Sequence, residues 1–151
     1  MATFSDTVYD MFLSSISDWR LDTLYQVSGS ASLSTYMEPW LLNSITDFDP
    51  VCDQDLTYSS GSQIFTGDLT QENINMLARI MELYWFQKRT QDTLQFENSL
   101  QDHDYKSFSQ AQNLREKKDY LNMKKEEISQ LINDYAFRKN DFASWKLQVF
   151  D

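Results

Sequence analysis

The stretch Ile74-Asn-Met-Leu-Ala-Arg-Ile-Met-Glu-Leu-Tyr-Trp-Phe86 decides the fold of this chain, because only Asn75, Arg79 and Glu82 interrupt its apolar residues. A helix that is apolar around most of its circumference must be covered by other elements, whereas a helix on a surface needs only one apolar stripe. The stretch is too short to cross a bilayer, which takes about 20 consecutive apolar residues. We therefore predict that it forms the central helix of a small helical domain. The expected core residues are Ile74, Leu77, Ile80, Met81, Tyr84 and Trp85.

The composition favours one all-α domain. A chain of 151 residues is typical of a single domain, and 41% hydrophobic and 15% aromatic residues are enough to build a core. With only 3 Gly and 2 Pro, the chain is poor in the turn residues that an all-β fold requires. The single Cys52 cannot form an internal disulfide, which is typical of proteins assembled in a reducing cytosol. We expect neither a signal peptide nor a membrane span.

Two helices and a break are predicted before the third helix. Val8, Phe12 and Ile16 recur at helical spacing and predict a first helix over residues 4–16. Asp18-Trp19 begins a short second helix, which is expected to end at Ser28-Gly29-Ser30.

A third helix is predicted to end at Phe48, before the Asp49-Pro50 turn. Ser32 or Ser34 is expected to open this helix. The first turn of a helix tolerates proline, so Pro39 leaves a later start at Thr35–Glu38 as the alternative.

Residues 49–68 are predicted to form a long loop that carries a protruding hairpin. Two short extended pieces, Leu56–Tyr58 and Gln63–Thr66, flank a turn around Gly61. Loops of this length are usually functional or disordered. The candidate functional residues of this loop are Asp49, Asp53, Asp55, Tyr58 and Phe65.

The second half of the chain predicts two long helices. Thr70 caps the central helix, which is expected to end near residues 94–96, and the final helix is expected to run from Ser107 or Ser109 to about Asn140. Lysines occupy the positions beside the apolar seam in the first half of the final helix. We therefore expect its second half to pack on the central helix and its first half to be partly exposed, where it could meet a neighbouring subunit. The seam consists of Leu114, Leu121, Ile128, Tyr135 and Phe142.

An apolar tail at residues 142–151 follows the helical domain at residues 1–141. The tail could fold back on its own core, or it could reach a partner, for example by adding a strand to a sheet edge. Its candidate docking residues are Phe142, Trp145, Leu147, Val149 and Phe150.

The net charge of −10 is spread unevenly along the chain. Through Ser60 the chain has nine acidic residues and one basic residue, Arg20, so this part carries −8. Affinity for nucleic acids depends largely on Lys and Arg that neutralise phosphates. The chain is therefore not expected to bind DNA.

Catalytic and metal-binding patterns are weak, and we expect no enzyme, no metal and no cofactor. The one histidine, His103, lies between two aspartates in a polar connection and does not make a ligand set. The aspartate pairs near Asp47 and Asp53 lack the Gly and Glu that an EF-hand loop needs at its sixth and twelfth positions. Cys52 has no basic residue nearby that could activate it.

Five stretches spread over most of the chain resemble the head-to-tail connector (adaptor or neck) proteins of tailed bacteriophages. They are Val8-Tyr-Asp-Met-Phe-Leu-Ser-Ser-Ile16, Trp40-Leu-Leu-Asn-Ser-Ile45 with Phe48, Phe65 with Asp68-Leu-Thr70, Met81-Glu-Leu-Tyr-Trp-Phe86 and Lys106-Ser-Phe-Ser-Gln-Ala-Gln112.

The resemblance implies a structural protein of the virion neck, assembled in the host cytoplasm as a homo-oligomeric ring that is commonly twelvefold. The ring would bind the portal protein on one side and the next neck or tail protein on the other. DNA would pass through its channel without specific binding. The family also implies that a C-terminal segment docks on the portal, here Phe142–Phe150, and that a loop faces the lumen or the next ring, here Asp49–Asp68.

Two other functions remain open. A stopper or tail-terminator ring has the same composition but a different symmetry, usually sixfold. An acidic inhibitor that mimics DNA and binds a host nucleic-acid enzyme would also explain the −8 of the first 60 residues.

Overall fold

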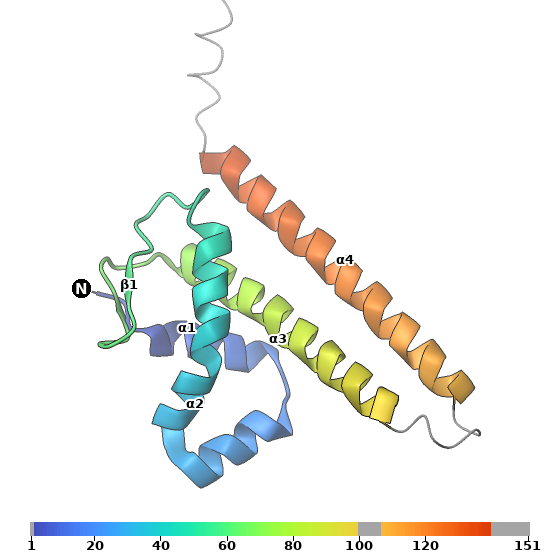
Figure 1. The fold of residues 1–151 in the computed structure, drawn as a ribbon. Coiled ribbons are helices and arrows are strands. Elements are labelled where there is room, and N and C mark those ends of the chain that lie inside the picture. The colour runs from blue at the N-terminus through green and yellow to red at the C-terminus, as the bar shows by residue number, and fades with distance from the viewer. Residues whose placement is uncertain (1, 100–106, 140–151) are drawn as a thin grey trace, which may run out of the picture.

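The computed structural model describes residues 2–99 and 107–139, and this part of the chain folds into four helices and one small hairpin (Figure 1). The predicted all-α class, with a long central helix and a longer C-terminal one, is confirmed. In chain order the elements are α1 (Ser5–Ser15), α2 (Trp19–Phe48), β1 (Tyr58–Ser59), β2 (Ile64–Phe65), α3 (Gln71–Ser99) and α4 (Ser107–Lys139).

Helix α3 is the centre of the fold, because it packs against α1, α2 and α4 (Figure 1). Its first half is covered on most sides, as the apolar stretch predicts: Leu77, Ile80 and Met81 have no exposed surface. Burying one large apolar side chain contributes roughly 1.5–3 kcal/mol to folding. The fully buried large apolar side chains from the rest of the described chain are Val8, Phe12, Met37, Leu41, Phe48, Leu56, Phe65 and Tyr135.

Helix α2 bends at Gly29, which has φ +81° and ψ 178°. The predicted break at this position is confirmed, because such backbone angles are readily adopted only by glycine. The helix resumes directly after the bend, close to the predicted opening at Ser32, so the alternative start at Thr35–Glu38 is wrong. Pro39 lies inside the helix. Both Pro39 and Thr35, whose carbonyl has lost its helical donor, are exposed, so water can satisfy that carbonyl.

The predicted hairpin is confirmed, with β1 and β2 antiparallel and Tyr58 opposite Phe65. The N-terminal segment adds a third extended piece beside β2. The Thr3 amide donates to the Gly67 carbonyl at 3.1 Å, and the Phe65 amide donates to the Thr3 carbonyl at 2.9 Å. The hairpin is therefore attached to the start of the chain and is not a free protrusion.

Helix α4 runs alongside α3 and buries mainly its second half (Figure 1). Ile128 is 7% exposed and Tyr135 is fully buried, whereas Leu114 and Leu121 are only partly buried. The predicted difference between the two halves of the seam is confirmed for these residues. Lysines replace apolar neighbours in the first half, which leaves less surface to bury.

Candidate functional site

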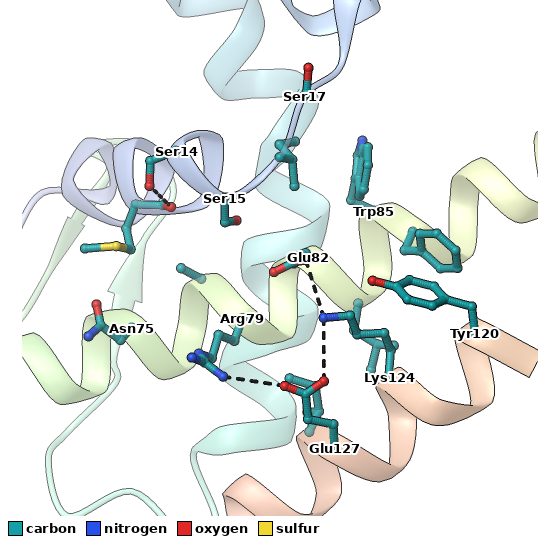
Figure 2. Close-up of a pocket in the computed structure, with 16 residues that line it drawn as sticks. Ser14, Ser15, Ser17, Asn75, Arg79, Glu82, Trp85, Tyr120, Lys124 and Glu127 are labelled. Atoms are coloured by element: carbon teal, nitrogen blue, oxygen red, sulfur yellow. Dashed lines mark hydrogen bonds and ion pairs between the residues drawn. The ribbon is translucent and has the colours of Figure 1, made fainter. Parts of the chain in front are cut away.

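A groove of about 670 Å³ lies where α1, α3 and α4 meet (Figure 2). Ser14 and Ser15 form its α1 edge, Glu82 lies on α3, and Tyr120 and Lys124 lie on α4. Helix α1 packs on the first, buried half of α3. Helix α4 lies farther from α1 toward the N-terminal end of α4 (Figure 1). The hollow between them is therefore open to one side and has walls from three helices.

The charged side chains of this groove pair with one another. The Lys124 ammonium lies 3.8 Å from Glu82 and 3.5 Å from Glu127, and the Arg79 guanidinium lies 3.7 Å from Glu127 (Figure 2). Burial opposes the charged form of Lys124, but the two carboxylates raise its pKa above the ordinary value. The ion pairs join α3 to α4, and they leave the groove without a free charge to attract a ligand.

Two hydroxyl groups of the groove, those of Ser14 and Ser15, also make hydrogen bonds with neighbouring atoms. Ser14 Oγ donates to the Met11 carbonyl at 2.7 Å, and Ser15 Oγ donates to the Phe12 carbonyl at 2.7 Å. A serine nucleophile needs an adjacent base, and no imidazole lines this groove. Tyr120 packs edge-on against Phe86, with ring centroids 4.8 Å apart. The arrangement is that of an aromatic and ionic contact surface.

A second group of polar residues, the polar hub, consists of Asp53, Gln54, Asn73 and Tyr135. The Tyr135 hydroxyl donates to Asp53 Oδ1 and lies 2.8 Å from Asn73 Oδ1. Asn73 Nδ2 donates to Gln54 Oε1 at 2.6 Å and to Asp53 Oδ1 at 3.1 Å. Gln54 Oε1 also accepts from the Thr70 amide at 2.8 Å. The hub therefore ties the 49–68 loop to the start of α3 and to the end of α4.

Electrostatics in the hub stabilise the ionised carboxylate. Hydrogen bonds from Tyr135, Asn73 and Lys139 lower the pKa of Asp53 to about 2. Burial and the neighbouring carboxylate raise the pKa of the Tyr135 hydroxyl. Lys139 Nζ lies 3.0 Å from Asp53 and 3.4 Å from Glu72, which adds a cation beside the carboxylate.

The five candidate loop residues do not form one partner surface. Asp49 and Asp55 are exposed, whereas Asp53 belongs to the hub and Tyr58 donates to Glu38 Oε1 at 3.3 Å. Phe65 is fully buried, so the expectation that it is a partner contact is wrong for this structure. Its side chain enters the core because β2 lies beside the N-terminal segment and turns one face inward.

Most of the expected core residues are buried. Ile74, Leu77, Ile80 and Met81 are at most 5% exposed, whereas Tyr84 and Trp85 are partly buried at the edge of the core. These two side chains use their polar atoms at that edge. Tyr84 donates to Asp47, and burial together with this carboxylate raises the pKa of Tyr84 to about 12.

Asp18 has a structural role that the sequence predicts only in part. Its side chain is 3% exposed and caps α2 by accepting from the Arg20 amide at 3.0 Å. It also accepts from Trp85 Nε1 at 2.9 Å and lies 3.6 Å from the Arg89 guanidinium. The cap can be predicted from an Asp before a helical run, but the contact with α3 spans 67 residues and leaves no local signal.

Several predictions fall outside the described residues. They concern the docking residues Phe142, Trp145, Leu147, Val149 and Phe150, the domain boundary at residue 141, and the connection that contains His103. Within residues 2–99 and 107–139, no group of three or more His, Cys, Asp or Glu side chains is arranged to hold a metal ion. In the same ranges no helix has the length and apolar character needed to span a membrane.

Comparisons with protein-family models, with curated proteins and with solved structures find no match to this chain.

Proposed function

We propose that this chain is a structural subunit of the ring that joins the portal of a tailed bacteriophage to the next neck or tail component. The observation that carries the proposal is the resemblance of five stretches, which are spread from Val8 to Gln112 and include a part of each of the four helices. The proposed subunit works through its shape and its surfaces, because a ring that extends a channel needs no chemistry of its own.

The helical architecture supports this proposal. Residues 112–123 of α4 are exposed apart from two partly buried leucines, with Tyr120 42% and Met123 53% exposed. Aromatic residues and Met are enriched in the buried centres of interfaces between proteins. Such side chains on an otherwise polar helix suit a subunit that buries further surface on assembly.

The charge of the chain supports the same proposal. The net charge of −10 opposes adhesion of a DNA backbone, and DNA has to slide through a connector. A ring multiplies this charge by the number of its subunits. DNA would therefore pass through the channel without being bound.

Mass spectrometry of purified particles tests the proposal. The chain should be present at a fixed copy number relative to the portal protein, commonly in a ratio of one to one. Its absence from complete particles would contradict the proposed function. The symmetry of the ring in an image then separates an adaptor from a stopper or a tail-terminator ring.

Binding to isolated portal rings tests the proposed role of the C-terminal residues. The double substitution Trp145→Ala with Phe150→Ala should weaken binding at least tenfold, because aromatic side chains commonly dominate interface energies. Val27→Ala with Leu42→Ala is the matched control, since both side chains are exposed in the subunit and lie outside the surfaces assigned to assembly. Equal binding by both double variants would exclude the tail as the docking segment.

A second candidate function is an acidic inhibitor that mimics DNA. The specific observation in its favour is the uneven charge, with −8 in the first 60 residues. This function predicts salt-sensitive binding to a nuclease or another DNA-binding enzyme, and it predicts no stoichiometric presence in particles. The particle measurement above therefore distinguishes the two candidates.

A further inference from the structure

A second groove, of about 860 Å³, is lined by residues of α1 and of both halves of α2, on either side of the Gly29 bend. No basic residue is among the residues that line it. We call it the acidic groove, after Asp6, Asp10 and Asp22, which are exposed at its edge and make no ion pair or side-chain hydrogen bond within the described part of the chain.

The walls of the acidic groove are aromatic and aliphatic. Trp19 is 69% exposed and Tyr25 is 50% exposed, and both line the groove together with the partly buried Leu13 and Ile16. Exposed aromatic rings beside free carboxylates suit a partner that presents cations on an apolar surface, because the rings can also stack on cationic side chains.

Helix α4 carries a surface of this kind. Arg115, Lys118 and Lys125 are exposed, and they make no ion pair with the described residues. Their spacing of three and seven residues places them along one side of the helix. We call them the basic stripe. Leu114 and Leu121, which are only partly buried, lie next to the stripe on the helix surface.

We propose that the acidic groove of one copy receives the basic stripe of a second copy. The argument is charge complementarity, since three exposed carboxylates line the groove and three exposed cations form the stripe, and none of the six makes an ion pair with the described residues. None of the stripe residues lines the groove of its own chain. This inference rests on the proposed ring subunit and deepens it by naming the two surfaces that join neighbours.

The two surfaces are different, so the contact is heterologous. Each copy would offer one groove and one stripe, and a contact of this type repeats from copy to copy until it closes a ring. The partly exposed leucines and the aromatic walls would supply apolar burial, because exposed ion pairs contribute little alone and are screened by salt.

Charge reversal of the full-length chain tests the inference. The groove variant is Asp10→Lys with Asp22→Lys, and the stripe variant is Lys118→Glu with Lys125→Glu. The control, Glu116→Lys with Asp134→Lys, changes the net charge as much as the groove variant does, at exposed α4 positions that lie about 100° around the helix from Arg115 and away from the stripe. Sedimentation velocity at low and high salt measures the mass, and far-UV circular dichroism confirms that each variant is folded.

The wild type and the control should assemble at low salt. Each reversed variant alone should dissociate at a salt concentration roughly tenfold lower than the wild type does, or should need a protein concentration roughly tenfold higher to assemble. An equal mixture of the groove and stripe variants should assemble again, because each copy then meets an oppositely charged neighbour. This recovery requires both variants to be folded.

Assembly of either reversed variant as strong as that of the wild type would overturn the inference, as would a mixture that stays dissociated. A wild-type chain that remains monomeric at low salt would also overturn it. None of these results decides whether the chain is present in particles, so failure of the interface and failure of the proposed function remain separate.

Discussion

The hydroxyl of Tyr135 connects segments that lie 82 residues apart in the chain, because it donates to Asp53 while its ring is fully buried against Phe48. Removing one partner from a buried polar group leaves the other without its hydrogen bond, at a cost of roughly 1–3 kcal/mol. Tyr135→Phe should therefore lower the free energy of unfolding by about 2 kcal/mol. Urea unfolding should show a lower midpoint with an unchanged slope.

Tyr36→Phe is the matched control for this change. Tyr36 is 46% exposed, and its hydroxyl makes no hydrogen bond with the described residues. Its removal should change the free energy of unfolding by less than about 0.5 kcal/mol. Equal effects of the two substitutions would show that the hub does not hold the loop to α4.

Acid should weaken the same hub through Asp53. The folded-state pKa of about 2 lies below the ordinary value of 3.8, so the ionised form stabilises the fold above pH 4. This contribution is lost as the pH falls from 4 toward 2. Because the Asp53 side chain is 36% exposed and screened by water, we expect about 1 kcal/mol.

The difference in stability between the wild type and Asp53→Asn measures this contribution. Asp53→Asn should be the less stable protein at pH 6, and the difference should shrink as the pH approaches 2. Thermal unfolding at a series of pH values gives both quantities. A difference that stays constant over this range would contradict the assigned cause.

Among the elements, the bend of helix α2 depends on the backbone conformation of a single residue, Gly29. Gly29 has open space around its Cα, so a methyl group added there would meet no neighbouring atom. Gly29→Ala would still force a side chain into a conformation that only glycine adopts readily, at a cost of about 1–3 kcal/mol. The expected result is a lower unfolding midpoint in urea.

Gly61→Ala tests whether the backbone angle causes this effect. Gly61 also has open space, but its φ is not in the positive range. This substitution should be neutral or stabilising by up to about 1 kcal/mol, because it restricts only the unfolded chain. If Gly61→Ala lowered the stability as much as Gly29→Ala does, backbone strain would be excluded as the explanation.

The helices could be predicted from local patterns, whereas the contacts between them could not. The spacing of Val8 and Phe12, the cap at Thr70 and the glycine at position 29 are local signals, and each marks an element or a bend that the structure contains. Pro39 misled the prediction of a helix start, because proline is preferred in the first turn but is also tolerated at an exposed interior position.

The polar hub shows why the candidate site was harder to predict than the fold. The sequence predicts Asp53 as a candidate residue of the 49–68 loop and Tyr135 as one residue of the apolar seam of the final helix. Their hydrogen bond depends on how α4 lies on α3, which no local pattern contains. Phe65 was misplaced for the same reason, since its burial depends on pairing with the N-terminal segment.

At the scale of the whole molecule, burial and free charge are divided between different regions. The second half of α4 contributes Ile128 and Tyr135 to the core, whereas residues 112–120 are exposed apart from Leu114. Local opening requires less free energy where fewer apolar contacts are broken. The first half of α4 is therefore the part of this helix that assembly can stabilise most.

Hydrogen exchange of the full chain should detect this difference. In the dissociated variant Lys118→Glu with Lys125→Glu, backbone amides at residues 112–125 should exchange faster than those at residues 128–139, because they open with fewer buried contacts. In the assembled wild type the exchange at residues 112–125 should slow by at least roughly tenfold, since the neighbouring acidic groove would cover the basic stripe. Exchange at residues 128–139 should change less and serves as the internal reference. Slowing confined to residues 128–139, or equal exchange in the two halves of the dissociated chain, would contradict this division of the molecule.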